Sequence, residues 1–328
     1  PMMRVLVIQL KRIGDLLLTT PLLSVLREQV PDIHLTLAID AATSPLAPAI
    51  DADRVLVFQR GLAGLSFWRA IAAERFDLVL DVTGNDRSAL VAALSKARKR
   101  VTWQRFQKRP FRKLVYTDFV DSSVRDRHTA DHHTDLLRAL DIHVEGVPTE
   151  LRLPANAVEE AASVLKDLPP RFAVVHPGTA RAEKFWLPER WSEVIRFLEE
   201  EMGLSVVVTG SNAPMEREHL AAIAAHRPIR SLAGKLSLLG TAALIQRATV
   251  VCSVDSAPVH LADALGTPVV ALFGPTNPFH WRPRRSRSIV VRSAGAGPIR
   301  PKDPGSPMSE ISTDLVRDAV KQLLSGSR

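Results

Sequence analysis

Short apolar runs alternate along this chain with longer stretches whose apolar residues recur at helical spacing. In the first half, the runs that predict strands cover residues 4–10, 34–39, 54–58 and 78–82. A helix is predicted to begin near Thr20 and Pro21, with Thr20 as its cap and Pro21 at its first position. The loop that precedes this helix, residues 11–15, follows directly from the first strand.

The second half repeats this alternation. Its predicted strands cover residues 172–176, 204–209, 250–254 and 269–273. Between them, helical spacing runs from Trp191 to Met202, with Gly203 placed to end that helix, and a further helix lies within residues 214–225. Because strands alternate with helices in both halves, the pattern predicts an α/β fold built from doubly wound parallel sheets.

A polar stretch with two prolines, residues 146–156, is the candidate linker between the halves. We therefore expect one domain over residues 1–150 and a second over residues 151–328. Two such domains facing each other create a central cleft, which is a common place for ligands.

Composition narrows the class of protein. The chain has 328 residues, 46% of them hydrophobic, and its one cysteine, Cys252, allows no intrachain disulfide. The apolar run at residues 5–8 is too short for a signal peptide, and no run approaches the ~20 residues of a membrane span. We expect a soluble cytoplasmic protein. A net charge of +8 favours a polyanionic partner, such as nucleic acid, anionic lipid or a phosphorylated sugar.

The basic segment, residues 96–113, holds many of these cations and no acidic residue. Trp103, Phe106 and Phe111 are interleaved among them. Three interpretations stay open: a solvated surface loop, a patch that meets a phosphorylated or membrane-borne acceptor, and a nucleic-acid site. We favour the acceptor patch. With the loop after the first strand included, the expected acceptor contacts are Arg12, Arg105, Lys108, Arg109 and Arg112.

Polar residues also collect where the strand at 250–254 meets the helix that follows it. Asp255, Ser256 and His260 lie at this junction. In an open parallel sheet this edge holds the ligand, and the N–H groups at a helix start favour an anion, typically a phosphate. The alternative is that Asp255 and Ser256 only cap the helix.

Several chemistries lack their motif. The sequence has no GxGxxG, no GxxxxGK[ST] and no GxSxG, which argues against dinucleotide oxidoreductases, P-loop NTPases and α/β-hydrolases. Asp51 and Asp53 form a DxD, but they precede a predicted strand and are expected to serve a turn. His128, His132 and His133 have a spacing that could put two on one helix face; a place at a helix N-terminus is favoured over a metal site. We expect no metal and no cofactor.

Four segments, in order, resemble the ADP-heptose heptosyltransferases of glycosyltransferase family 9. They read KRIGDLLLTTP, HPGTARAEKFWLPERW, TGSNAPMERE and VDSAPVHLADALGTPVVALFGPTNP, and they extend over nearly the whole chain. The N-terminal half is most similar to the branch that adds a third heptose to the lipopolysaccharide inner core. The resemblance implies the GT-B architecture of two Rossmann-like domains, with ADP-heptose in the C-terminal domain and the acceptor mainly in the N-terminal domain.

The resemblance and the residue types together suggest roles. Asp15, on a loop at a strand end, is placed to serve as general base and matches the base proposed for the family. Lys184 supplies a point charge for the departing diphosphate, unless it is only a solvated loop lysine. Glu216 is expected to accept from ribose hydroxyls, with a surface helix carboxylate as the alternative. The full set of expected donor contacts is Gly14, Thr179, Lys184, Glu216, Asp255, Ser256, Ala257 and His260.

The sequence thus predicts a metal-independent, inverting glycosyltransferase. Its expected partners are ADP-heptose, a phosphorylated lipopolysaccharide core and the anionic inner face of the cytoplasmic membrane, but not nucleic acid. Two alternatives stay open: a GT-B transferase that uses another nucleotide sugar, and a non-catalytic protein that binds polyanions.

Overall fold

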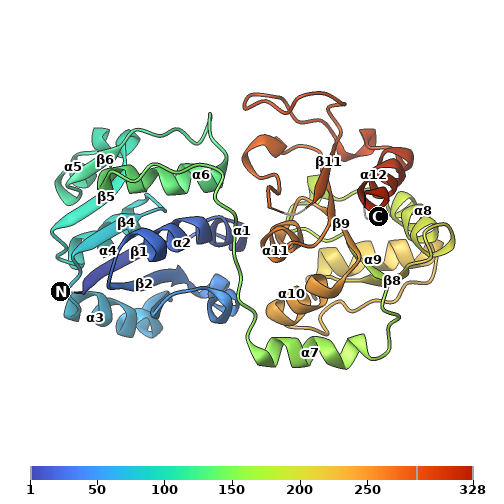
Figure 1. The fold of residues 1–328 in the computed structure, drawn as a ribbon, viewed down its shortest axis with the longest axis horizontal. Coiled ribbons are helices and arrows are strands. Elements are labelled where there is room, and N and C mark those ends of the chain that lie inside the picture. Colours follow the sequence, from blue (N-terminus) through green and yellow to red (C-terminus); the bar gives the residue numbers. More distant parts are fainter. Residues whose placement is uncertain (1, 286, 327–328) are drawn as a thin grey trace. The chain divides into compact units, whose positions relative to one another are not determined.

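Each half of the chain forms its own parallel sheet in the computed structural model, which describes residues 2–285 and 287–326 (Figure 1). The division between the two units falls between Arg152 and Leu153, two residues beyond the expected boundary. Within the described residues, no helix has both the length and the apolar character needed to cross a bilayer.

The sheet of unit 1 has the strand order β3-β2-β1-β4-β5-β6, and all of its registered pairs are parallel. Its strands are β1 (Met3–Gln9), β2 (Ile33–Asp40), β3 (Arg54–Phe58), β4 (Leu78–Asp81), β5 (Lys99–Trp103) and β6 (Asp118–Val120). The first four were predicted. The last two were missed, because β6 has only three residues and β5 lies inside the basic segment, where charged residues interrupt the apolar pattern.

Helices cover both faces of this sheet. The α-helices of unit 1 are α1 (Ile13–Leu17), α2 (Thr20–Gln29), α3 (Leu65–Ala73), α4 (Asp86–Leu94), α5 (Pro110–Val115) and α6 (Thr129–Thr134). Its 3-10 helices, written η, are η1 (Ala41–Ala49), η2 (Gly61–Gly64), η3 (Gln104–Lys108) and η4 (Asp135–Leu140). Side chains of α3 and α4 share a core cluster with Leu6 and Ile8 of β1, whereas α2 lies beside α6 (Figure 1).

The sheet of unit 2 has the order β11-β10-β9-β7-β8 and is also parallel throughout its registered pairs. Its strands are β7 (Phe172–His176), β8 (Ser205–Val208), β9 (Val250–Val254), β10 (Val269–Phe273) and β11 (Ser288–Arg292). Its helices are α7 (Ala155–Leu165), η5 (Ala182–Lys184), α8 (Pro188–Glu200), α9 (Pro214–His226), α10 (Leu238–Arg247), α11 (Ala257–Leu265), η6 (Pro278–His280), η7 (Met308–Glu310) and α12 (Thr313–Ser325).

The core of unit 2 is layered in the same way. Trp191 of α8, Ile223 of α9 and Val320 of α12 pack with Cys252 of β9 in one cluster. Val259 of α11 packs with residues of β10 in a separate cluster, and α10 contacts both α7 and α11. Both units are therefore doubly wound, as the alternation of strands and helices predicted.

Local signals set several helix ends. Proline lies in the first turn of α2, α5, α8, α9 and α11, where its missing N–H costs nothing. The cap of α2 is Thr19, not Thr20 as predicted, since Thr20 is already helical. Gly203 follows α8 with φ +64°, a left-handed conformation that suits glycine and stops the helix.

The strand orders create one switch point in each unit. In unit 1 the chain proceeds outward from β1 to β3 and then returns to place β4 on the other side of β1; in unit 2 the same reversal puts β9 beside β7. Loops that leave neighbouring strands in opposite directions open a crevice at their carboxyl ends, where ligands of such sheets bind. The residues after β1 and β4, and those after β7 and β9, are therefore the places to look for a site.

Candidate functional site

Lys184 and Asp255 meet at the switch point of unit 2. Lys184 ends η5 in the loop after β7, and Asp255 directly follows β9. Lys184 Nζ donates to Asp255 Oδ2 over 2.7 Å, and the two side chains are 14% and 9% exposed. Lys184 is therefore not a solvated loop lysine. An ammonium carries three N–H groups, so the ion pair holds the charge in place while occupying one of them.

The start of α11 lies next to this ion pair. Ser256 is the N-cap residue, but its hydroxyl makes no capping hydrogen bond; it lies 3.4 Å from the Val254 carbonyl oxygen instead. Asp255 is engaged by Lys184, so neither side chain acts only as a cap. Ala257 opens the helix, and a helix start that no side chain closes attracts negative charge. This junction therefore suits an anionic ligand.

His260 lies one turn further along α11 and is 6% exposed. Its ring meets the Trp281 ring edge-to-face, with centroids 6.3 Å apart. Trp281 follows η6 in the segment after β10, so this contact joins residues beyond the ends of two neighbouring strands. Trp281 was not among the predicted site residues, although it follows the GPTNP segment that carries part of the resemblance.

Glu216 is buried in the first turn of α9, with 9% of its surface exposed, so it is not a surface carboxylate. Its Oε2 accepts from the Ser211 N–H at 2.8 Å. A Cβ on Gly178 would lie 2.4 Å from this same oxygen, so only glycine leaves room for Glu216 here. The neighbouring Thr179 is also buried, and its Oγ1 accepts from the Arg181 N–H at 3.2 Å.

Two histidines that were not predicted lie near Glu216. His176 ends β7, and its Nδ1 is 2.9 Å from Thr209 Oγ1. Burial lowers the pKa of His176 to about 4, although the Glu216 charge acts in the opposite direction. Burial also lowers the pKa of His219, whose ring lies 4.4 Å from that of Phe185. Both rings are therefore neutral at neutral pH. One signal in the sequence could have identified His176 as a site residue: it lies between a predicted strand and the Pro177-Gly178 pair.

Asp15 lies at the switch point of unit 1. The predicted loop after β1 is in fact the short helix α1, which begins at Ile13 with Arg12 as its N-cap. Gly14 and Asp15 are consecutive residues of this helix, and Asp15 is half-buried. Gly14 thus belongs to unit 1, whereas the other expected donor residues belong to unit 2.

The basic segment is not a surface loop. Residues 99–103 form strand β5, and Trp103 has no exposed surface. Lys99 and Arg100 are held within the unit, since Lys99 donates to the Ala139 carbonyl and Arg100 to the Val115 carbonyl. The interleaving of cations and aromatic residues therefore reflects a strand with a buried face, followed by a short exposed stretch.

Arg112, one of the expected acceptor contacts, also has an internal role. Its Nε and Nη2 donate to Asp86 Oδ1 at 3.0 and 2.8 Å, and its guanidinium lies 4.5 Å from the Phe106 ring centroid. It joins α5 to the start of α4. The exposed cations of this stretch are instead Arg105, Lys108, Arg109 and Lys113.

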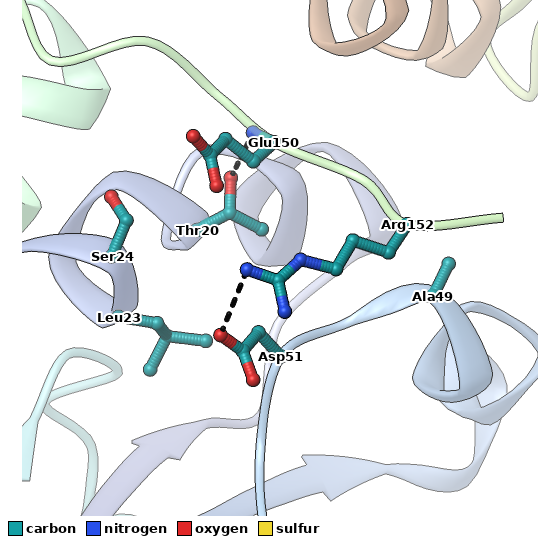
Figure 2. Close-up of a pocket in the computed structure, with 7 residues that line it drawn as sticks. All are labelled: Thr20, Leu23, Ser24, Ala49, Asp51, Glu150 and Arg152. Atoms are coloured by element: carbon teal, nitrogen blue, oxygen red, sulfur yellow. Dashed lines mark hydrogen bonds and ion pairs between the residues drawn. The ribbon is translucent and has the colours of Figure 1, made fainter. Parts of the chain in front are cut away.

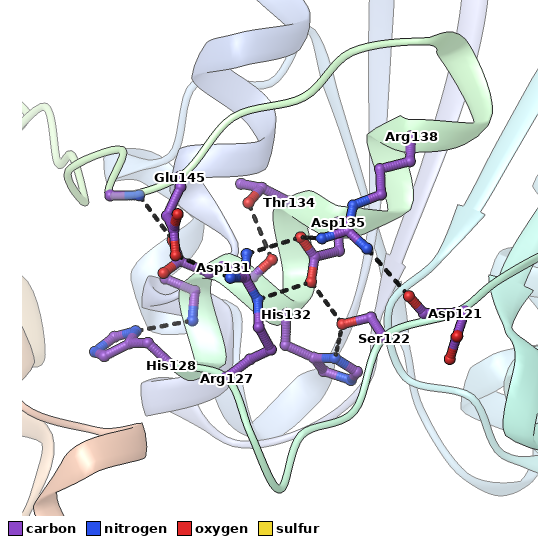
Figure 3. Close-up of polar contacts among 12 residues, drawn as sticks. Asp121, Ser122, Arg127, His128, Asp131, His132, Thr134, Asp135, Arg138 and Glu145 are labelled. Carbon is purple, nitrogen blue, oxygen red and sulfur yellow. Dashed lines mark hydrogen bonds and ion pairs between the residues drawn. The ribbon is translucent and has the colours of Figure 1, made fainter. Parts of the chain in front are cut away.

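His128, at the N-cap of α6, and His132, within α6, make separate contacts (Figure 3). His128 is the N-cap residue, and its Nδ1 accepts from the Ala130 N–H at 3.1 Å. The His132 ring stacks on Trp103 with centroids 3.7 Å apart, and its Nδ1 lies 2.8 Å from Ser122 Oγ. His128 and His132, with their spacing of four, thus contact different partners, and His128 lies at a helix N-terminus.

A buried carboxylate completes this network. Asp135 accepts from Ser122 Oγ at 2.6 Å and from the guanidinium groups of Arg127 and Arg138 (Figure 3). Arg127 also pairs with Glu145 at 2.9 Å. Because these contacts join the segment before α6 to the segment after it, they hold α6 firmly in unit 1.

The DxD serves the turn before β3, as expected. Asp53 Oδ2 accepts from Arg27 Nη1 at 2.9 Å and from the Leu35 N–H at 2.7 Å. Burial alone would raise the pKa of Asp53, but Arg27 and the Leu35 N–H outweigh it and hold the pKa below its usual value. Asp51 pairs with Arg27 and with Arg152. Both carboxylates are thus neutralised by arginine.

A small cavity lies beside this turn (Figure 2). Its volume of about 20 Å³ suits roughly one water molecule. Two contacts join residues of its lining: the Arg152–Asp51 ion pair and the hydrogen bond from the Glu150 N–H to Thr20 Oγ1. These contacts attach the end of unit 1 to α2 and to the turn that follows η1. The lining residues are Thr20, Leu23, Ser24, Ala49, Asp51, Glu150 and Arg152.

Comparison with known proteins matches a family model, "Glycosyltransferase family 9 (heptosyltransferase)", to residues 64–304. Lipopolysaccharide heptosyltransferase 3 of Escherichia coli K12 is 28% identical over 286 residues, 82% of each chain. The lipopolysaccharide core heptosyltransferase OpsX of Haemophilus influenzae is 26% identical, over 93% of this chain and 88% of its own.

Solved structures of this family have the same fold as this chain. The glycosyl transferase family 9 protein of Veillonella parvula has a TM-score of 0.87 and 26% identity, covering 99% of this chain and 98% of that one. The E. coli ADP-heptose heptosyltransferase II shares the fold, with a TM-score of 0.80, 22% identity and 99% coverage of both chains. The two doubly wound units are those of the predicted GT-B architecture. Since the family model covers most of both units, the chain belongs to glycosyltransferase family 9, the heptosyltransferases.

Proposed function

We propose that this enzyme moves heptose from ADP-heptose to a hydroxyl of the lipopolysaccharide inner core, with inversion at the anomeric carbon. The family assignment and the names of its relatives support the substrate class. The observation that carries the proposal is the Lys184–Asp255 ion pair, set beside the start of α11 at the switch point of unit 2. A diphosphate is stabilised by a positive charge that lies beside a helix N-terminus.

The leaving group is an anion, so positive charges placed beside it lower the barrier to its departure. Lys184 supplies a positive charge that Asp255 holds in a nearly buried position, and the N-terminus of α11 adds the positive end of its dipole. Fixed charges of this kind stabilise a departing diphosphate without a metal ion. Thr179 adds a hydroxyl, and Ser256, Ala257 and His260 line the same helix start.

Glu216 is the proposed acceptor for the ribose hydroxyls. Its Oε2 already accepts a hydrogen bond from the Ser211 N–H, which fixes the carboxylate. Its Oε1 is left to accept a hydrogen bond from a ribose hydroxyl of ADP-heptose. The donor would thus be held by residues that follow β7, β8 and β9, three neighbouring strands of one sheet.

Asp15 is the proposed base. It accepts the proton of the acceptor hydroxyl while that oxygen forms a bond to the anomeric carbon. The bond from this carbon to the phosphate oxygen breaks on the opposite side, and ADP departs with the bonding electrons. The sugar passes through an oxocarbenium-like state, and attack opposite the leaving group inverts the configuration.

Cations follow the strands of unit 1 at the edge that carries Asp15. Arg12 follows β1, Arg60 follows β3 and Arg105 follows β5, and all three are exposed. Carboxyl ends of parallel strands share one edge of a sheet, so these charges suit the phosphates of a lipopolysaccharide core. With Lys108 and Arg109, they form the proposed acceptor surface.

The same region is proposed to touch the inner face of the cytoplasmic membrane. Helix α5 exposes two large apolar side chains, Phe111 at 50% and Leu114 at 83%, next to Arg109 and Lys113. Anionic lipid attracts basic residues by about 1 kcal/mol each, and apolar side chains between them can enter the headgroup region.

One assay tests the substrate assignment. Purified protein is incubated with a truncated lipopolysaccharide core and ADP-heptose, with UDP- and GDP-sugars in parallel, and the product linkage is read by NMR. We expect transfer from ADP-heptose alone, with inverted configuration. Transfer from another nucleotide sugar would establish the alternative donor. Stabilisation by oligonucleotides without stabilisation by ADP, in a thermal-shift assay, would favour a polyanion-binding protein.

A further inference from the structure

The short helix that carries Asp15 is spanned by one buried side chain. Gln9 is the last residue of β1 and has no exposed surface. Its Oε1 accepts from the Lys11 N–H at 3.2 Å, and its Nε2 donates to Thr19 Oγ1 at 3.0 Å. Lys11 precedes α1 and Thr19 follows it, so Gln9 joins the two ends of this helix.

Thr19 connects that link to Asp15 itself. Its hydroxyl donates to the Asp15 main-chain oxygen at 2.7 Å. The Thr19 N–H donates to the Leu16 oxygen instead of the Asp15 oxygen, because the chain turns into α2 at this point. The hydroxyl therefore supplies the hydrogen bond that a continued helix would have given to Asp15.

His133, which lies more than a hundred residues later on α6, completes the arrangement. Its Nδ1 is 3.0 Å from the Leu18 oxygen and 3.1 Å from Thr19 Oγ1. A carbonyl oxygen only accepts, so Nδ1 carries the hydrogen. This one hydrogen is shared between the Leu18 oxygen and Thr19 Oγ1. The Thr19 hydroxyl gives its own hydrogen to Asp15, accepts one from Gln9 and accepts the shared hydrogen of His133.

This arrangement is rigid. Gln9 and Thr19 have no exposed surface, and His133 is 2% exposed. Burial lowers the pKa of His133 to about 3, against a smaller opposing effect of the Leu18 carbonyl, so the ring is neutral at neutral pH. Helix α6 is itself held by Asp135, which directly follows it and pairs with Arg127 and Arg138.

We propose that Gln9, Thr19 and His133 are positioning residues that fix the backbone of α1, so that the Asp15 carboxylate keeps the orientation in which it takes the acceptor proton. The inference rests on the proposed role of Asp15 as base. A five-residue helix is not stable by itself, because its few internal hydrogen bonds do not offset the cost of nucleation. Its geometry therefore comes from these tertiary contacts.

The test compares two substitutions of His133. His133→Leu removes the N–H at similar volume, whereas His133→Asn keeps an N–H near the position of Nδ1. We expect His133→Leu to lower kcat by roughly 10- to 100-fold, as for small misplacements of a catalytic group. The KM of the acceptor and the Kd of ADP should stay near wild type, and His133→Asn should recover most of the lost kcat.

His132→Leu is the matched control. His132 is the neighbouring buried histidine, but its contacts are with Trp103 and Ser122 and not with α1. We expect it to lower the Tm as His133→Leu does while kcat per folded molecule stays near wild type. Equal loss of kcat in both leucine variants, or no recovery in His133→Asn, would reduce His133 to a residue of the core.

Thr19→Val and Thr19→Ser give the same comparison if the His133 variants do not fold. Valine is close in shape to threonine and lacks the hydroxyl, so we expect kcat to fall; serine keeps the hydroxyl and should preserve it. Unchanged kcat in Thr19→Val would overturn the proposal.

A double variant separates this inference from the assignment of the base. If His133 acts through Asp15, His133→Leu should lower kcat little further in the Asp15→Asn background, because the two effects are not additive. If the two substitutions instead lowered kcat by independent factors that multiply, the proposed positioning role of His133 would be contradicted, while Asp15 would remain the base. Wild-type turnover in Asp15→Asn alone would instead contradict the proposed base.

Discussion

Lys184 Nζ and Asp255 Oδ2 lie 2.7 Å apart although the two residues are 71 positions apart in the chain. Each follows a different strand, and the strands β7 and β9 are neighbours only because the sheet reverses its order between them. The ion pair therefore marks the switch point of unit 2, and it places a nearly buried cation beside a helix N-terminus.

Replacement of Lys184 should impair chemistry more than folding. We expect Lys184→Met to lower kcat by roughly 10²–10³, the loss seen when one charge-stabilising donor is removed. Asp255 is left with no cation, so the Tm should also fall, and Asp255→Asn added to Lys184→Met should recover the Tm but not kcat. Lys166→Met, at an exposed position of the same unit, is the control. Recovery of kcat in the double variant would show that Lys184 only neutralises Asp255.

Replacement of Asp15 should remove the base and spare the donor site. A positioned base contributes roughly 10²–10⁴ in rate, so Asp15→Asn should lose about that much turnover while its Kd for ADP stays near wild type. Single-turnover assays and calorimetry measure the two quantities. Asp141→Asn, at an exposed position of the same unit, is the control. Near wild-type single-turnover rates in Asp15→Asn would mean that another group takes the proton.

Activity should persist in chelator. Lys184 and the start of α11 supply positive charge for the diphosphate, and the carboxylates of Asp51 and Asp53 are paired with arginine. Initial rates are compared with and without EDTA after exhaustive dialysis. A loss of turnover that Mg²⁺ or Mn²⁺ restores would contradict metal independence.

The exposed cations after β5 should govern use of the acceptor. We expect the triple variant Arg105→Gln, Lys108→Gln, Arg109→Gln to raise the acceptor KM and to weaken its dependence on salt. Arg112 stays unchanged, because its bond to Asp86 would make its loss structural.

The ADP Kd of this triple variant should match wild type. The control is a triple glutamine variant of exposed cations in unit 2: Arg196, Arg217 and Lys235. An unchanged acceptor KM in the first variant, or an equal rise in the control, would show that the stretch is merely solvated.

Acid should destabilise the protein through its buried histidines. Burial, followed by the charge of His133, lowers the pKa of His132 from 6.5 to about 2. Below about pH 6.5 the unfolded chain therefore binds a proton that the folded chain does not, and the free energy of unfolding falls as the pH drops. The slope approaches about 1.4 kcal/mol per pH unit for each such group.

Chemical denaturation at pH 7 and pH 5 measures this effect. His132→Phe keeps a ring against Trp103 but cannot titrate, so its free energy of unfolding should fall less than that of wild type between the two pH values. A parallel fall in both proteins would exclude His132 as a contributor.

The sequence by itself determined the elements that rest on local patterns. Apolar runs predicted β1 to β4 of unit 1 and β7 to β10 of unit 2. Gly203 follows α8 at the predicted place with φ +64°. These signals are local, because burial of a strand and a left-handed turn each depend on a few adjacent residues. The four ordered motifs likewise predicted the family that the comparisons confirm.

Only the tertiary structure decided which side chains meet. It pairs Lys184 with Asp255, seats Glu216 against Gly178, and brings His133 to the helix of Asp15. It also buries Trp103 in a strand, within a segment for which a solvated loop was one of the open interpretations. These contacts depend on the order of strands in a sheet and on which helix covers which face. The strand order and the helix positions that leave the least apolar surface exposed depend on the whole unit. A local stretch of sequence therefore cannot predict them.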